Sequence, residues 1–215
     1  MYSGENLYIW QSADWPNWRY DLSALTGPLT EVSRAQGLLL GRLADVGMTL
    51  RDQASLAALT EDVVKTSEIE GEVLNVQSVR SSIARRMGVD IGAVAPVDRH
   101  VEGVVEMVLD ATTRAAEPLT AERLFGWHAA LFPTGYSGMT RIEVGQWRCD
   151  AEEPMQVVSG HLGRRKVHFQ APPAQDLSAE IDRFLVWANA ETVEPTLIKA
   201  GLAHLWFVTL HPFDD

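Results

Sequence analysis

The chain has 215 residues, 46% hydrophobic and 22% charged, which is typical of one globular domain or of a domain with a small appendage. The sequence has 18 Lys and Arg and 29 Asp and Glu, which gives a net charge of -11. This negative charge argues against nucleic acid or an anionic membrane as a partner. One cysteine, Cys149, excludes an intramolecular disulfide and multi-cysteine metal sites. No apolar run approaches the roughly 20 residues of a membrane span, and no signal peptide is visible. We therefore expect a cytoplasmic protein.

The chain opens on an aromatic stretch that is too hydrophobic for a solvated tail. Three tryptophans lie close together there: Trp10, Trp15 and Trp18. This stretch predicts an irregular segment or a short strand packed on the rest of the protein. Apolar residues then recur at helical spacing over about 28–46 and 51–70, which predicts two helices. Gly71 follows the second pattern, and a glycine at that place commonly ends a helix.

Helical patterns continue through much of the remaining chain. We predict helices over about 77–87, from Pro96 to about 109, from an N-cap at Thr120 to about 131, over 176–189 and over 195–210. The last of these is apolar nearly all round, which is typical of the buried axis of a domain. The block 132–154 is rich in Gly, Pro and Thr and is predicted to be loop.

Residues 155–171 carry the clearest β-hairpin signal. The β-prone runs MQVVS and KVHFQA are separated by GHLGRR, which contains two glycines. Because an isolated two-stranded hairpin is only marginally stable, we expect it to lie against the helical body or against a partner. The sequence therefore predicts a mainly α fold with a small β-hairpin.

The last predicted helix ends at His211, because Pro212 cannot continue it. Asp214 and Asp215 follow and supply hard oxygen ligands of the kind that Mg²⁺ prefers. A histidine beside a metal-binding carboxylate is suited to act as a general base in phosphoryl or nucleotidyl transfer. Taken alone, however, a histidine at a helix end is more often a cap or a packed side chain.

A second cluster of carboxylates lies in the segment TSEIEGE. Thr66 and Glu70 are four residues apart and share one face of the predicted helix. Glu68, Glu70 and Glu72 lie at its C-terminal end, where the helix dipole disfavours negative charge, so we expect a cationic partner from elsewhere. By themselves these residues are also typical of a solvated acidic helix end.

Together these segments resemble the Fic family. HPFDD, at the end of the chain, resembles the first half of the family signature HPFx(D/E)GNGRxxR. TSEIEG resembles the family's inhibitory motif (S/T)xxxE(G/N), with Thr66, Glu70 and Gly71 at its specified positions. The predicted hairpin lies upstream of the histidine, where Fic proteins carry a target-docking flap. RIEVGQWR, WHAALF, SSIARR and the tryptophan-rich start resemble further family segments, so the resemblance covers essentially the whole chain.

The resemblance implies a mainly α, Fic-type helical bundle with a small β-hairpin flap and an N-terminal helical extension. Residues 1–95 would form the extension, with an inhibitory helix at about 51–71. Residues 96–215 would form the Fic core, incomplete at its C-terminus, with the flap at about 155–171. The family also suggests a homodimer, although nothing in the composition requires one.

The implied activity is that of an autoinhibited protein adenylyltransferase, which moves AMP from ATP to a hydroxyl of a target protein. His211 would match the catalytic base, and Asp215 the acidic residue that holds Mg²⁺ on the phosphates of the nucleotide. Phe213 would anchor the loop, while Asp214 occupies a variable position without an implied role. The residues that would dock the target by strand addition are Val167, His168 and Phe169.

Glu70 matches the inhibitory glutamate. In the family this glutamate pairs with the last arginine of the signature and keeps the γ-phosphate of ATP out of its productive position. The GNGRxxR half of the signature is not in the sequence. We therefore expect the natural protein to continue with Gly-Asn-Gly-Arg, and the 215-residue chain by itself to be inactive.

Two alternatives stay open at this stage. Glu70 could instead position a water that removes AMP from a modified target, in which case Glu70→Gly would abolish removal and raise transfer. The chain could also be a non-enzymatic helical interaction module, because it lacks the GNGR loop. The sequence does not specify the target protein, the acceptor residue type or the nucleotide.

Overall fold

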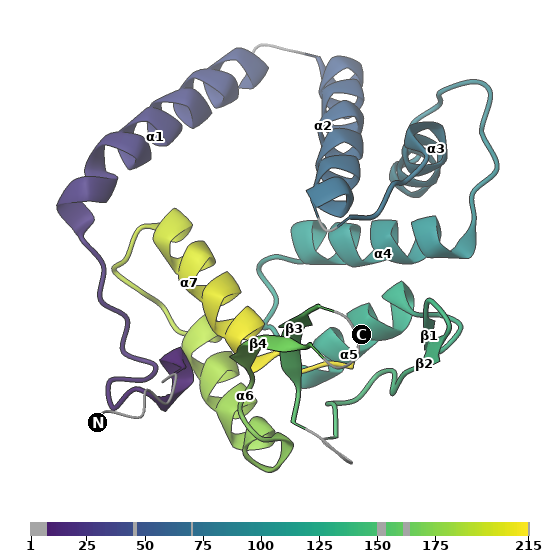
Figure 1. Ribbon diagram of the computed structural model, residues 1–215. Coiled ribbons are helices and arrows are strands. Elements are labelled where there is room, and N and C mark those ends of the chain that lie inside the picture. The colour runs from purple at the N-terminus through teal and green to yellow at the C-terminus, as the bar shows by residue number, and fades with distance from the viewer. Residues whose placement is uncertain (1–7, 45–46, 70, 150–153, 161–163, 215) are drawn as a thin grey trace, which may run out of the picture. The chain divides into compact units, whose positions relative to one another are not determined.

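The computed structural model describes residues 8–44, 47–69, 71–149, 154–160 and 164–214 (Figure 1). The described part is mainly helical with two small antiparallel hairpins, as predicted. Its elements, in chain order, are η1 (Ile9–Gln11), α1 (Leu22–Ala44), α2 (Met48–Ile69), α3 (Val76–Met87), α4 (Arg99–Thr113), α5 (Ala121–Leu131), β1 (Tyr136–Ser137), β2 (Thr140–Arg141), β3 (Gln156–Ser159), β4 (Lys166–Gln170), α6 (Ala174–Asn189) and α7 (Thr196–Leu210). No helix within these ranges is long and apolar enough to cross a membrane.

The chain divides into two compact units. Unit 1 comprises Met1–Leu22, Leu119–Phe125 and Arg141–Asp215, and unit 2 comprises Ser23–Pro118 and Gly126–Thr140. Each unit has its own cluster of buried hydrophobic residues. The boundary near residue 95 that the sequence suggested stays a prediction.

The core of unit 2 is built by α2, α3 and α4. Its most deeply buried large residues, each at most 2% exposed, are Leu56, Val63, Val79, Ile83, Val101 and Val105. The start of α4 is fixed by Asp98, whose side chain accepts a hydrogen bond of 2.8 Å from the backbone N–H of Val101. The helix predicted from Pro96 therefore begins three residues later, at Arg99.

Helix α1 begins earlier than predicted, at Leu22, and contains Pro28 in its second turn. A proline lacks one intrahelical N–H donor and is tolerated best near a helix start. The predicted apolar stripe is helical but much of it is exposed, since Val32, Leu38 and Leu39 are 40%, 54% and 57% exposed. Periodicity predicted the helix and carried no information about what covers it.

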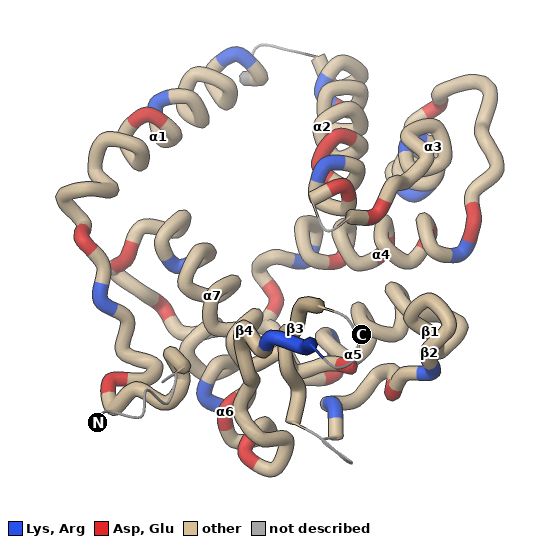
Figure 2. Tube along the Cα trace, viewed as in Figure 1, with Lys and Arg blue, Asp and Glu red and all other residues tan. Residues whose placement is uncertain are grey.

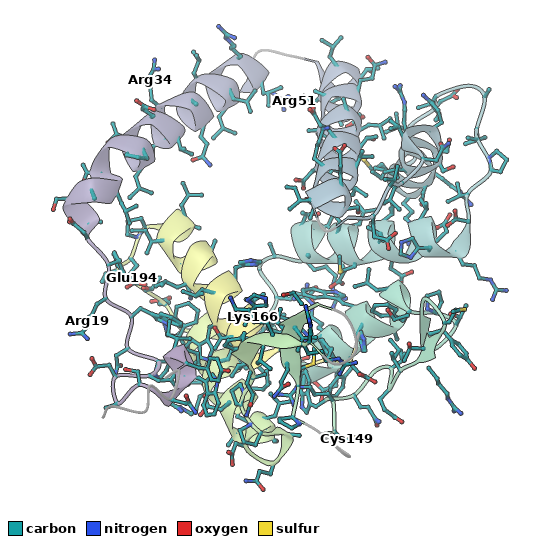
Figure 3. All side chains as sticks on the ribbon, viewed as in Figure 1. Arg19, Arg34, Arg51, Cys149, Lys166 and Glu194 are labelled. Carbon is teal, nitrogen blue, oxygen red and sulfur yellow. The ribbon has the colours of Figure 1, made fainter. Side chains whose placement is uncertain are left out.

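In unit 1, α6 and α7 lie side by side (Figure 1) and share an aromatic cluster. The rings of the cluster come from both helices and from the N-terminal segment: Phe184, Trp187, Trp206, Phe207, Trp15 and Trp18. Tyr20 adds a hydrogen bond of 2.9 Å to Glu194, which Figure 3 labels. The prediction that the tryptophan-rich start is an irregular segment packed on the protein is confirmed.

Two further sequence predictions need correction. Helix α7 is not buried all round, because Leu205 and Val208 are 40% and 50% exposed while Trp206 is 3% exposed. The helix packs on α6 along one side, so its other side stays open despite its apolar composition. The block 132–154 is also not entirely loop, since it contains the two-residue strands β1 and β2.

Candidate functional site

Strands β3 and β4 form the predicted antiparallel hairpin of unit 1. Val157 pairs with Phe169 and Val158 pairs with Val167, so a shift of register leaves His168 without a partner residue on β3. The exposed His168 ring lies 2.6 Å from the hydroxyl of Ser159, measured from Nε2 to Oγ. Val167 and Phe169 are half-buried. The hairpin is confirmed, whereas target docking by these three residues stays a prediction.

The N-terminal segment braces this hairpin, which two strands alone would not stabilise. The indole Nε1 of Trp10 donates a hydrogen bond of 2.7 Å to the carbonyl oxygen of Gln170. The ring of Tyr8 meets that of Phe169 edge-on, with 5.4 Å between the centroids. The hairpin therefore lies against the rest of unit 1, as expected.

Positive charge gathers where β4 begins. The exposed basic residues there are Arg164, Arg165 and Lys166 (Figures 2 and 3). Cys149, also labelled in Figure 3, is an exposed free thiol.

His211 directly follows α7 and has a left-handed backbone, with φ 45° and ψ 62°. Its N–H donates the last helical hydrogen bond, 3.0 Å to the carbonyl oxygen of Phe207. Within the described ranges it is the only non-glycine residue with a positive φ. Such a conformation costs a residue with a Cβ about 1–2 kcal/mol and persists where the surroundings hold it, which is common at functional sites.

The residue that holds His211 is Arg148, which is 5% exposed. Its guanidinium Nε donates a hydrogen bond of 2.6 Å to the carbonyl oxygen of His211. A terminal guanidinium nitrogen lies 2.6 Å from the carbonyl oxygen of Pro172 and 3.4 Å from that of Leu210. A cation at the C-terminal end of α7 also complements the negative end of the helix dipole.

The residues after His211 are fixed by the segment 142–148. The backbone N–H of Arg148 donates 2.9 Å to the carbonyl oxygen of Pro212, and that of Glu143 donates 3.0 Å to the carboxylate of Asp214. Phe213 packs against Trp147, with 5.2 Å between ring centroids. The predicted anchoring role of Phe213 agrees with this contact, and Asp214 gains a structural role that the sequence did not suggest.

The segment predicted to be the inhibitory motif lies in unit 2, at the end of α2. Thr66 is exposed on the helix, and Gly71 adopts the left-handed conformation with φ 88°. Gly71 N–H donates to the carbonyl of Glu68, and Glu72 N–H donates to that of Ser67, which together form a Schellman helix stop. The predicted glycine stop is confirmed. Glu70 lies outside the described residues.

Two carboxylates at this helix end each lie close to a side-chain nitrogen. Lys65 Nζ lies 2.7 Å from Glu68, and this hydrogen bond holds the pKa of Glu68 below its ordinary value. His100 of α4 lies 3.6 Å from Glu72, measured from Nε2 to Oε2. One partner therefore comes from α2 itself and the other from a helix far along the chain.

The described residues contain no group of three or more His, Cys, Asp or Glu side chains that could hold a metal ion. Mg²⁺ does not require such a group, because one or two carboxylates and the phosphate oxygens of a substrate suffice. One oxygen of Asp214 already accepts the Glu143 N–H. Asp215, the predicted ligand, lies outside the described residues, and its carboxylate chemistry fits a magnesium ion carried by a nucleotide.

Sequence reasoning missed Arg148 and the tether of Asp214. Both act on backbone groups, and 63 residues separate Arg148 from the carbonyl that it contacts at His211. Hydrogen bonds of this kind depend on the fold and leave no spacing pattern in the sequence.

Two regions of the chain are similar to known protein families. Residues 118–215 match the Fic/DOC family model, and residues 8–89 match a model described as a domain of unknown function, DUF4172. A solved structure of a Fic family protein from Desulfovibrio desulfuricans G20 is similar over 93% of this chain, with a TM-score of 0.53 and 19% identity. That similarity shows the fold alone, and this chain spans 55% of the length of that protein. No curated protein matches. Residues 118–215 therefore resemble the Fic/DOC family.

Proposed function

We propose that the Fic/DOC domain transfers AMP from ATP to a hydroxyl side chain of a target protein. The observation that carries this proposal is the left-handed backbone of His211, which lies at the end of α7 within the region that matches the family model. Backbone strain that the surrounding structure maintains is a feature of many active sites, which supports a functional role for this histidine. Because ATP is the proposed donor, we expect the reaction to take place in the cytoplasm.

In the proposed reaction, the imidazole of His211 accepts the proton of the target hydroxyl. The hydroxyl oxygen then forms a bond to the α-phosphorus of ATP. The bond from that phosphorus to the oxygen bridging to the β-phosphate breaks, and pyrophosphate leaves. Asp215 would hold Mg²⁺, which neutralises charge on the phosphates when it is bound.

The proposed docking site for the target is the hairpin. In the described part of the chain β3 and β4 pair only with each other, so no further strand occupies the outer edge of either, and the indole of Trp10 donates to the Gln170 carbonyl at the end of β4. A target segment would add to such an edge as a further strand, which positions its hydroxyl through main-chain hydrogen bonds. Val167, His168 and Phe169 would then contact its side chains.

We further propose that Glu70 restrains the activity. Its removal should therefore raise AMP transfer, whereas removal of His211 should abolish it. The test is intact-mass spectrometry of a Glu70→Gly protein, expressed from the complete gene and incubated with ATP and Mg²⁺. We expect added mass equal to one or more AMP groups, lost in Glu70→Gly/His211→Ala and retained in the matched control Glu70→Gly/His204→Ala, since His204 is an exposed residue of α7.

Absence of an adduct on the protein itself, and on proteins of a lysate from its own source, would contradict the transferase proposal. The same samples distinguish the reverse reaction. Release of AMP from a modified target by the wild type, and not by Glu70→Gly, would show that Glu70 takes part in removal instead.

A further inference from the structure

The guanidinium of Arg148 joins two segments that carry different parts of the candidate site. It donates to the carbonyls of Leu210 and His211 at the end of α7, and to the carbonyl of Pro172 in the connection that follows β4. The side chain is 5% exposed, so these contacts are made away from bulk water. Burying a charged group is costly unless it is hydrogen-bonded, and here the partners include backbone carbonyls.

The geometry of these contacts depends on arginine. A guanidinium presents five N–H donors in a rigid planar fork, which allows one side chain to reach carbonyls on separate segments at the same time. A lysine ammonium carries its donors on one atom and cannot span the same set. The backbone N–H of Arg148 adds a bond to the carbonyl of Pro212, so the carbonyls of His211 and of the residue after it are both held by Arg148.

These contacts act on the conformation of His211. Left-handed backbone is unfavourable for histidine and requires support from its surroundings. If the carbonyl of His211 lost its donor, the backbone would relax toward a commoner conformation and the imidazole would move with it. A displacement of about 1 Å at a catalytic group can cost about 100-fold in rate.

We propose that Arg148 is a positioning residue, which holds His211 in its left-handed conformation and ties it to the segment after flap strand β4. The proposal rests on the proposed function for its effect on catalysis. The predicted effect of Arg148 on the backbone of His211 holds whether or not the proposed function is correct. Arg148 itself touches neither substrate nor nucleotide in this role.

The first test compares AMP transfer by the Glu70→Gly protein from the complete gene with that of the same protein carrying Arg148→Lys or Arg148→Met. We expect kcat to fall at least tenfold in both variants, with KM for ATP changed less than twofold. Arg183→Lys is the matched control, because Arg183 is an exposed arginine of α6 in the same unit and pairs with Glu180. It should leave both constants unchanged. Circular dichroism shows which variants fold, and Arg148→Lys decides the test if Arg148→Met does not.

The second test reads the backbone directly. In protein labelled with ¹³C-histidine, the Cα and carbonyl shifts of His211 report its φ and ψ, and the signal is assigned by its loss in His211→Ala. We expect these shifts to move in Arg148→Lys and to stay in Arg183→Lys, whether or not AMP transfer is observed. Absence of AMP transfer in the Glu70→Gly protein would overturn the proposed function alone. Unchanged His211 shifts in a folded Arg148→Lys protein would overturn the positioning role, even if kcat fell.

Discussion

Position 211 has a backbone conformation that favours glycine and carries a histidine. Replacing His211 by glycine removes the clash of Cβ with its own backbone, whereas alanine retains it. We therefore expect His211→Gly to have a free energy of unfolding about 1 kcal/mol higher than that of His211→Ala. Urea denaturation, followed by tryptophan fluorescence, measures this difference. Both variants should lack AMP transfer, since neither has the imidazole.

His204 provides the control for this prediction. It lies within α7 and is exposed, so its backbone is helical and its side chain has little packing to lose. There the order should reverse, with His204→Gly about 1 kcal/mol less stable than His204→Ala. The same order at both positions would show that residue 211 is not held in a left-handed conformation.

At the scale of secondary-structure elements, the approach of α4 to α5 depends on Gly103. A Cβ added at this position would overlap the carbonyl oxygen of Ala130 on α5, so the two backbones would have to separate. We expect Gly103→Ala to lower the free energy of unfolding by about 3 kcal/mol. Gly126→Ala in α5 is the control, because nothing lies within 4 Å of its added Cβ, and it should gain up to about 1 kcal/mol. Chemical denaturation of the two variants should therefore give shifts of opposite sign.

Helices α3 and α4 are also joined by charges around Glu102. Burial opposes ionisation of Glu102, but hydrogen bonding from Arg86 and the charge of Arg85 outweigh it and hold the pKa below its ordinary value of 4.5. A lowered pKa means that the interaction stabilises unit 2 above the ordinary pKa and is lost as the pH falls through the lower one. Glu102→Gln should therefore cost about 1 kcal/mol near pH 7 and less near pH 3.

Urea denaturation at the two pH values measures this dependence. Glu106→Gln is the matched control, because Glu106 is 62% exposed and its distance to Arg86 is 3.4 Å, against 2.9 Å for Glu102. The cost of Glu106→Gln should be smaller than that of Glu102→Gln near pH 7. An equal cost of Glu102→Gln at both pH values would contradict the assignment to charge.

At the scale of the whole molecule, periodicity and turn chemistry predicted most elements, because these patterns are local. The stop at Gly71, the cap at Thr120 and the hairpin were all visible in the sequence. Burial was not, since it depends on which helix packs on which, and the open side of α7 shows this. The candidate base could be predicted from a motif, whereas the contact between Arg148 and His211 required the fold.

The two units have separate hydrophobic clusters, and among the residues that the structure describes none belongs to both. Their local stabilities should therefore respond to different substitutions. Ile181→Ala removes a residue of α6 that is 1% exposed and should speed amide hydrogen exchange in α6 and α7 while leaving α3 unchanged. Gly103→Ala should speed amide hydrogen exchange in α3 while leaving α6 and α7 unchanged. Helix α5 has residues in both units, so its exchange should rise in both variants. Exchange measured by mass spectrometry tests this, and an equal rise in all helices after either substitution would show that the two clusters unfold as one.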